Sequence, residues 1–158
     1  MLRAVTLLAV LLSAAPVVAN DLVGVASVID ADTIEIRGVR IRLHGIDAPE
    51  SRQSCTRGSG DAWRCGQQAA LALSDRIGRR PVNCMVRDVD RYDRAIAVCM
   101  EGGEDLNRWL VSEGWAVAYR RYSRDYIGAE DQARRAGRNI WSGQFVMPWD
   151  WRRGQRLP

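Results

Sequence analysis

The stretch D-A-D-T-I-E-I-R-G-V-R-I-R-L-H-G-I-D-A-P-E, residues 30–50, decides the fold of this chain. Its two runs of alternating apolar and polar residues, 33–37 and 40–44, flank a glycine turn, and this pattern predicts a β-hairpin. A hairpin brings its two ends together, so we expect Asp32 and Asp47 to lie close in space. Carboxylates that lie so close repel each other unless a cation sits between them. The stretch therefore predicts one half of a metal site.

Two further charged residues of this stretch are expected to face the same place. Arg42 lies in the second strand between apolar neighbours, where a charged side chain costs desolvation unless it meets an anion. Glu50 follows Pro49, which cannot donate a backbone hydrogen bond, so the chain leaves the sheet there in a rigid loop. We expect Glu50 to hold a water molecule rather than the metal.

A site that cleaves phosphodiesters needs a hard cation, acidic oxygen ligands and cationic groups for the charge that builds on phosphorus. The hairpin supplies the acidic oxygen ligands and one cationic side chain, Arg42, but no second cationic side chain. Arg94, in the turn over residues 90–94, is the best candidate for it.

The first 19 residues are expected to be a secretory signal peptide rather than part of the fold. Arg3 supplies a positive charge, residues 4–13 form an apolar core, and Val17-Val18-Ala19 is a small-residue cleavage site. A transmembrane anchor is the alternative, but the segment is too short and wrongly flanked for one. The remainder is long enough for one domain with a single core.

Composition narrows the function only slightly. All 23 basic residues are arginine, and they face 19 acidic residues, which gives a formal net charge of +4. Arginine suits bidentate contacts to phosphate better than lysine does, although the base composition of a genome also explains such a bias. The charge is far from that of a histone-like protein and favours a polyanionic partner only weakly.

Four cysteines in an exported chain are expected to pair, and four allow three connectivities. Cys84 and Cys99 lie symmetrically about a turn near Tyr92, where a cross-strand bridge is geometrically natural, and Cys55 and Cys65 then close a short loop. A zinc site is the competing interpretation. It needs C-x-x-C spacing or several histidines, and the chain contains one histidine.

The remaining patterns predict an α+β domain. We expect strands over residues 22–29, 33–37, 40–44, 81–86 and 95–100, and helices over residues 66–77, 105–113 and roughly 124–136. In the first helix, Ala69, Leu73 and Ile77 recur at four-residue spacing. Asp105 is the expected N-cap of the second. Five short strands interleaved with three helices are typical of a small, curled sheet.

Five motifs in the chain resemble those of the staphylococcal nuclease family, also called thermonucleases. They are I-D-A-D-T at 29–33, R-L-H-G-I-D-A-P-E at 42–50, D-R-Y-D-R at 90–94, L-V-S-E-G-W-A at 110–116 and N-I-W at 139–141. They fall in the order and spacing of the family, and together they are highly specific. The resemblance implies an OB-like five-stranded β-barrel with three α-helices, and calcium-dependent cleavage of DNA and RNA.

The resemblance also implies roles for individual residues. Asp32 and Asp47 match the family's calcium carboxylates, and Ala48 matches a residue that ligates calcium through its backbone carbonyl. Glu50 matches the general base that activates or orders the attacking water.

Arg42 and Arg94 match the two arginines that bind the scissile phosphate and stabilise its transition state. Further residues match positions that contact a nucleotide's terminal phosphate and base, or lie near the family's stacking tyrosines, where the register slips by one residue: Asp90, Arg91, Tyr92, Tyr119 and Tyr122.

Two residues depart from the family pattern. Ala31 stands where the family usually has glycine, and a positive φ there would strain alanine by about 1 kcal/mol. Asp93 replaces a usual glycine just before Arg94. Aspartate tolerates the left-handed region, but its charge could weaken phosphate binding by Arg94.

These inferences divide the chain into a signal peptide (1–19), a nuclease-like domain (20–142) and a C-terminal tail rich in tryptophan and arginine (143–158). We expect a monomer that is exported to the periplasm or secreted, with no membrane contact once the signal is removed. Its expected activity is calcium-dependent hydrolysis of the 5′ P–O bond of DNA and RNA, which leaves 3′-phosphates.

Two alternatives stay open. A catalytically weak or inactive nucleic-acid-binding module on the same OB-like fold would be free to lose Arg42, Glu50 and Arg94, all of which this chain retains. A small secreted calcium-binding structural domain leaves the arginines unexplained.

Overall fold

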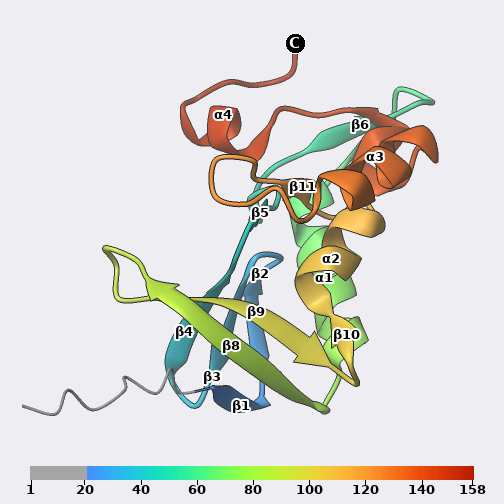
Figure 1. The fold of residues 1–158 in the computed structure, drawn as a ribbon. Coiled ribbons are helices and arrows are strands. Elements are labelled where there is room, and N and C mark those ends of the chain that lie inside the picture. The colour runs from blue at the N-terminus through green and yellow to red at the C-terminus, as the bar shows by residue number, and fades with distance from the viewer. Residues whose placement is uncertain (1–20) are drawn as a thin grey trace, which may run out of the picture.

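The computed structural model describes residues 21–158; the expected signal peptide lies outside the described residues. The body of the molecule is a curled, mixed β-sheet with helices along one side and across one end (Figure 1). Within the described part of the chain, no helix is both long enough and apolar enough to cross a membrane.

The main sheet has seven strands. Along the sheet they follow the order β1 (Leu22–Val25), β8 (Pro81–Val89), β9 (Ala95–Glu101), β4 (Val39–Leu43), β3 (Thr33–Ile36) and β2 (Ser27–Asp30), with the short β10 (Glu104–Asp105) paired to β9. The β4–β9 pair is parallel and the other pairs are antiparallel.

The chain curls this sheet by bending at Ala26. β1 pairs with β8 and β2 pairs with β3, so two strands adjacent in sequence lie at opposite ends of the strand order. Gly24 permits a close approach at this bend, because a Cβ there would lie 2.7 Å from Cγ2 of Ile36. The single strand predicted over residues 22–29 is therefore two strands in the structure.

The hairpin predicted over residues 33–44 forms from β3 and β4. Its turn places Arg37 at φ 51° and Gly38 at φ 80°, the left-handed conformations that a two-residue hairpin turn requires. Thr33 pairs with Arg42 at the open end. Four apolar side chains of the two strands are fully buried in the main core: Ile34, Ile36, Ile41 and Leu43.

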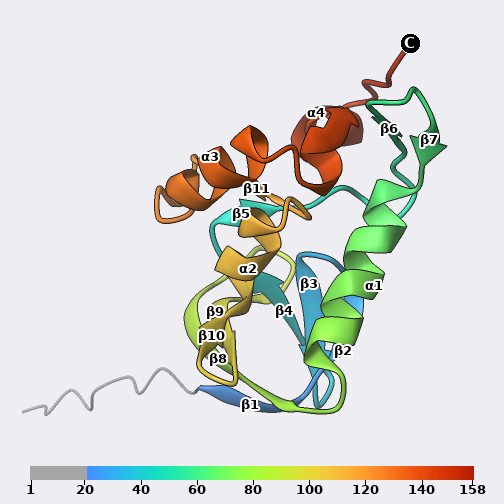
Figure 2. The ribbon, with the colours of Figure 1, turned by 90° about the vertical axis from the view of Figure 1, so that its right-hand side faces the viewer.

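Within residues 21–158, four α-helices and one 3-10 helix complete the fold. They are α1 (Cys65–Ile77), α2 (Leu106–Ser112), α3 (Ile127–Arg135), η1 (Asn139–Ser142) and α4 (Pro148–Arg152). Figure 2 shows α1 running along one side of the sheet, while α3 and α4 lie across the end of the molecule. Ala69, Leu73 and Ile77 of α1 are buried, and Asp105 caps α2 by accepting a hydrogen bond from the backbone N–H of Arg108 at 3.0 Å.

Two small sheets connect the barrel to the helical end. In one, β5 (Ile46–Asp47) pairs with β11 (Val117–Ala118). In the other, β6 (Cys55–Arg57) pairs with both β7 (Ala62–Trp63) and β12 (Gly143–Gln144). The second sheet therefore attaches the C-terminal segment to the loop that follows Glu50.

Both expected disulfides are present, and the described residues contain no free cysteine. Cys84 and Cys99 are direct register partners on β8 and β9, so their bridge joins two adjacent strands of the main sheet. Cys55 and Cys65 join β6 to the first residue of α1.

The OB-like α+β fold expected from the sequence is confirmed. All five predicted strands exist. The main sheet has seven strands in the described residues because the first predicted strand is bent into two and the short β10 is added. The three predicted helices exist as well, although α3 starts at Ile127 rather than near Arg124. The fourth helix, α4, was not predicted.

Gly66 controls the position of the loop that carries Glu50. A Cβ at Gly66 would lie 1.7 Å from the carbonyl oxygen of Glu50, a backbone atom that cannot move without shifting the loop. We expect Gly66→Ala to lower the free energy of unfolding by about 1–3 kcal/mol, the usual cost of overpacking, as measured by urea denaturation.

Gly128→Ala is the matched control, because Gly128 lies in α3 with nothing within 4 Å of the added Cβ. This substitution should stabilise the protein by up to about 1 kcal/mol through helix propensity. Equal effects of the two substitutions would contradict the close approach at Gly66.

Candidate active site

The two carboxylates predicted to meet do meet, on either side of Arg42. The Arg42 guanidinium lies 3.3 Å from Oδ2 of Asp32 and 3.0 Å from Oδ1 of Asp47. Asp47 is 0% exposed and Asp32 is 6% exposed. Two buried carboxylates therefore share the guanidinium of Arg42.

Backbone contacts fix Asp32 relative to the exit of the hairpin. Its Oδ2 accepts a hydrogen bond from the backbone N–H of Ala48 at 3.1 Å, and its Oδ1 accepts one from the hydroxyl of Thr33 at 3.0 Å. Its carbonyl oxygen accepts from the backbone N–H of Leu43 at 2.8 Å. Asp47 lies in β5, so strand pairing with β11 holds it in place.

A second arginine, from the C-terminal helix, also reaches this cluster. Nη2 of Arg152 lies 2.7 Å from Oδ2 of Asp47, and Nη1 lies 3.0 Å from Oδ1 of the same carboxylate. Nη1 also donates to Oε1 of Glu50 at 2.7 Å. Arg152 thus bridges Asp47 and Glu50, which lie more than 100 positions before it in the chain.

The electrostatics of the cluster reflect this burial. Burial raises the pKa of Asp47, and the nearby negative charge of Asp32 adds to it, although hydrogen bonding to Arg152 opposes the rise. Burial would lower the pKa of Arg152, but its hydrogen bonds to Asp47 and Glu50 outweigh that effect and raise it. The guanidinium of Arg152 therefore stays charged wherever the protein is folded.

Gln53 holds the Glu50 loop and ties it to the C-terminal segment. Its side chain is 0% exposed. Its Oε1 accepts a hydrogen bond from the backbone N–H of Glu50 at 3.2 Å, and its Nε2 donates to the carbonyl oxygen of Val146 at 2.6 Å. One buried amide therefore links the predicted general base to the chain that leads into α4.

In the turn over residues 90–94, the carboxylate of Asp90 holds the side chain of Arg94. Oδ2 of Asp90 accepts hydrogen bonds from Nε and Nη2 of Arg94 at 2.8 and 2.7 Å, and Oδ1 accepts from the backbone N–H groups of Tyr92 and Arg94. Burial raises the pKa of Asp90, but these hydrogen bonds outweigh it and lower the pKa. Asp90 thus orients Arg94 within the turn.

The two departures from the family pattern have different outcomes. Asp93 adopts φ 59°, so it occupies the left-handed conformation where glycine would be usual. Ala31 is not among the described residues with positive φ, and it packs in the core at 1% exposure. The strain considered for Ala31 therefore does not arise.

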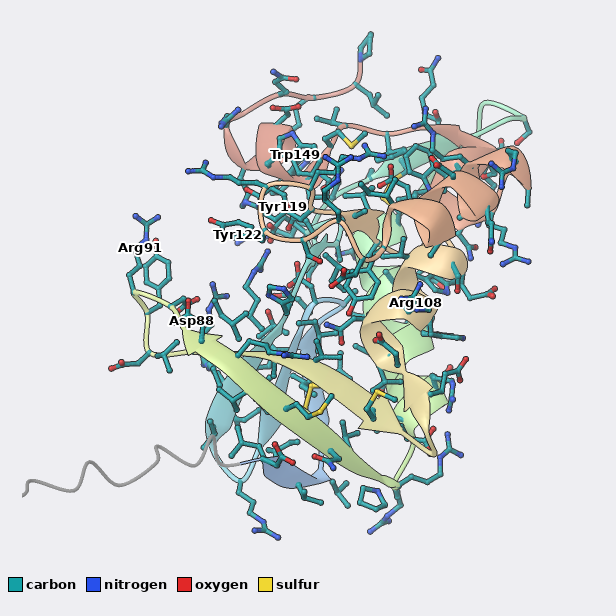
Figure 3. All side chains as sticks on the ribbon, in the orientation of Figure 1. Asp88, Arg91, Arg108, Tyr119, Tyr122 and Trp149 are labelled. Atoms are coloured by element: carbon teal, nitrogen blue, oxygen red, sulfur yellow. A yellow bond between two sulfur atoms is a disulfide. The ribbon has the colours of Figure 1, made fainter. Side chains whose placement is uncertain are left out.

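A cleft of about 1150 Å³ contains most of the predicted site residues. Figure 3 shows Asp88 and Arg91 on one side of it, and Tyr119, Tyr122 and Trp149 on the other. Further lining residues include Asp32, Arg42, Glu50, Tyr92, Arg94 and Arg152.

The aromatic wall of the cleft contains tyrosines that the sequence predicted as substrate-binding residues and one tryptophan that it did not. Trp149, from α4, stacks on Tyr119 with ring centroids 5.3 Å apart and planes 12° apart. Tyr122 meets the edge of Tyr119 at 4.9 Å and is 60% exposed. On the opposite side, Tyr92 is 66% exposed beneath the guanidinium of Arg91.

Comparison with known proteins agrees with this arrangement. Residues 40–143 match the protein family described as staphylococcal nuclease homologue. The chain belongs to the staphylococcal nuclease family. The matched range contains Arg42, Asp47, Glu50 and Arg94, whereas Asp32 and α4 lie outside it.

The chain is also similar to individual curated proteins. The chain is 33% identical over 173 residues to micrococcal nuclease of Shigella flexneri, covering 98% of this chain and 94% of that protein. It is 40% identical over 129 residues to the succinoglycan biosynthesis protein ExoI of Rhizobium meliloti (strain 1021), covering 80% and 68%. It is 30% identical over 141 residues to an uncharacterized endonuclease of Haemophilus influenzae, covering 84% and 74%.

The donor set suits a hard cation of the kind that the nuclease family implies. Among residues 21–158, no group of three or more His, Cys, Asp or Glu side chains is placed to hold a metal ion. Two carboxylate oxygens do converge on one cationic group, at 3.0 and 3.3 Å from Arg42. Calcium accepts carboxylate, backbone carbonyl and water oxygens in a flexible shell, and the carboxylates of Asp32 and Asp47 are donors of this kind.

Sequence reasoning missed three residues of this site: Gln53, Trp149 and Arg152. Gln53 lies in a polar loop where nothing distinguishes a buried amide from an exposed one. Trp149 and Arg152 lie in a tail with several tryptophans and arginines, and no periodic pattern there points to the cleft. Pro148, which suits the first turn of a helix, was the one local signal for α4.

Replacing Gln53 should loosen the link between the Glu50 loop and the C-terminal segment. Gln53→Met keeps the length of the side chain but leaves the N–H of Glu50 and the carbonyl of Val146 without their partner. We expect the free energy of unfolding, measured in urea, to fall by about 1–3 kcal/mol. Gln67→Met, at an exposed position of α1, is the control and should change it by less than about 0.5 kcal/mol.

Proposed function

We propose that this protein is a calcium-dependent nuclease that hydrolyses DNA and RNA at the 5′ P–O bond and leaves 3′-phosphates. The observation that carries the proposal is the convergence of Asp32 and Asp47 on Arg42, each within 3.3 Å. Asp32, Arg42, Glu50 and Arg94 line one cleft. Membership in the staphylococcal nuclease family supports it.

In the proposed reaction, Glu50 accepts a proton from the water that attacks phosphorus. The side chain of Gln53 holds the backbone of the loop that carries Glu50. Arg42 and Arg94 bind the non-bridging oxygens of the phosphate and stabilise the negative charge that grows on them. The bond to the 5′ oxygen then breaks, and that oxygen takes a proton from solvent.

Calcium, when bound, would neutralise the phosphate and help to position the attacking water. Asp32, Asp47 and the backbone carbonyl of Ala48 are the proposed ligands. The exposed aromatic residues of the cleft, Tyr92 and Tyr122, would stack on nucleobases, a contact that tolerates any base and favours single strands.

The proposed site of action is outside the cytoplasm. Two disulfides support this, since such bonds persist in oxidising compartments. We propose that residues 20–142 form the nuclease domain of an exported, monomeric enzyme.

The first test is cleavage of single-stranded DNA by the protein with calcium, followed by addition of a calcium chelator. We expect cleavage that the chelator stops and that renewed calcium restores, with 3′-phosphate ends on the products. Binding of DNA without cleavage would contradict the enzyme and leave the alternative, a nucleic-acid-binding module.

Glu50→Gln should keep DNA binding while lowering kcat by about two to four orders of magnitude, because it removes the group that accepts the proton. Glu113→Gln is the control: this carboxylate is 41% exposed and pairs with Arg138 on the surface. It should leave kcat within a factor of about two.

The arginines can be tested in the same assay. We expect Arg42→Ala or Arg94→Ala to lower kcat by about two to three orders of magnitude, the usual cost of losing a group that stabilises transition-state charge. Arg124→Ala removes an exposed arginine before α3 and controls for net charge. A loss confined to KM would show that the two arginines bind substrate without stabilising the transition state.

A further inference from the structure

Arg152 uses the same carboxylate oxygens that the proposed reaction requires. It donates to both oxygens of Asp47, the proposed metal ligand, and to one oxygen of Glu50, the proposed base. Neither the family motifs nor the matched range of residues includes it. This contact therefore needs an explanation of its own.

We propose that Arg152 is an internal counter-cation that competes with the divalent metal ion for Asp47, so that metal binding displaces Arg152 from the carboxylates. The inference rests on the metal site of the proposed function. It makes the C-terminal helix a determinant of metal affinity.

The competition follows from the arrangement of charges. Oδ1 of Asp47 already accepts hydrogen bonds from Arg42 and Arg152, and its Oδ2 accepts from Arg152 alone. A divalent cation on Asp47 would have to replace at least one of these contacts. It would also lie beside the positive guanidinium of Arg152, which it would repel.

The contact between Arg152 and the carboxylates of Asp47 and Glu50 is specific, and it can also be broken. The stacking of Trp149 on Tyr119 and the bond from Gln53 to Val146 hold the start of α4 against the nuclease domain. The Arg152 side chain itself is 38% exposed, and it lines the open cleft. The guanidinium can therefore leave the carboxylates while the helix stays in place.

Without this arginine, Asp47 would be a buried carboxylate next to Asp32 with only Arg42 to neutralise both. Desolvation and mutual repulsion make such a pair costly. Arg152 thus stabilises the metal-free protein and lowers its affinity for the metal ion. The reason is that the metal ion can bind Asp47 only after the contact between Arg152 and Asp47 has been broken.

The first experiment measures calcium affinity by isothermal titration calorimetry in the absence of nucleic acid. We expect Arg152→Ala, and Arg152→Gln as a second variant that keeps an amide donor, to bind calcium at least about ten times more tightly than the unaltered protein. Both variants should also unfold at a lower temperature without metal and gain more from calcium.

Arg153→Ala is the matched control. Arg153 is the next residue in the chain, its side chain is 73% exposed, and it pairs with Asp150 instead of the carboxylate cluster. The control removes the same formal charge from the same end of α4. Its calcium affinity should change by no more than about twofold, the scale of a screened surface charge.

The second experiment observes the arginine directly by NMR of ¹⁵N-labelled guanidinium groups, with the Arg152 signals assigned by their loss in Arg152→Ala. Saturating calcium should shift the Arg152 signals to values typical of exposed arginines and leave those of Arg153 unchanged. Signals of Arg152 that stay in place under saturating calcium would overturn the proposal, as would equal calcium affinity in Arg152→Ala and the unaltered protein.

These outcomes are separate from those of the nuclease assay. Tighter calcium binding by Arg152→Ala without any DNA cleavage would support the competition and contradict the proposed function. DNA cleavage together with unchanged calcium affinity of Arg152→Ala would support the proposed function and contradict the competition. Failure of every variant to bind calcium would overturn the competition together with the proposed metal.

Discussion

The carboxylate of Asp47, which has no exposed surface, is the constraint on which the rest of the site depends. A buried negative charge needs cationic partners at hydrogen-bond distance, and it needs more of them when a second carboxylate lies beside it. Arg42 meets this need from within the hairpin, and Arg152 meets it from the far end of the chain. The two arginines thus fix the hairpin and the C-terminal helix around one group.

The fold supplies the rigidity that this cluster needs. The bend at Ala26 curls the sheet, and the hairpin of β3 and β4 is buried along one face by isoleucine and leucine. Asn107 of α2 fixes the end of β4, because its buried amide donates to the carbonyl oxygens of His44 and Ala97 and accepts from the N–H of Cys99. The oxygens that would bind metal are therefore placed by packed structure and not by a mobile loop.

The C-terminal segment adds contacts to the barrel that the five family motifs do not include. β12 pairs with the disulfide-linked strand β6, Gln53 bonds to Val146, and Trp149 stacks on Tyr119. A segment that looks like a trailing end in the sequence is thereby part of the wall of the cleft.

The sequence by itself determined the hairpin, the five short strands predicted for the main sheet (the first of which is bent into two), the disulfide pairing and the meeting of Asp32 with Asp47. Each of these follows from local periodicity, turn chemistry or the short reach of a hairpin, which act between residues close in the chain. The turn over residues 90–94 pointed to Arg94 as a second cation, and Arg94 lines the same cleft as Asp32.

Only the tertiary structure decided that Arg152 binds Asp47, that Gln53 is buried, and that Trp149 faces Tyr119. These contacts join residues about 30 to 105 positions apart. They depend on how α4 packs across the end of the barrel, and no local pattern in the tail encodes that packing.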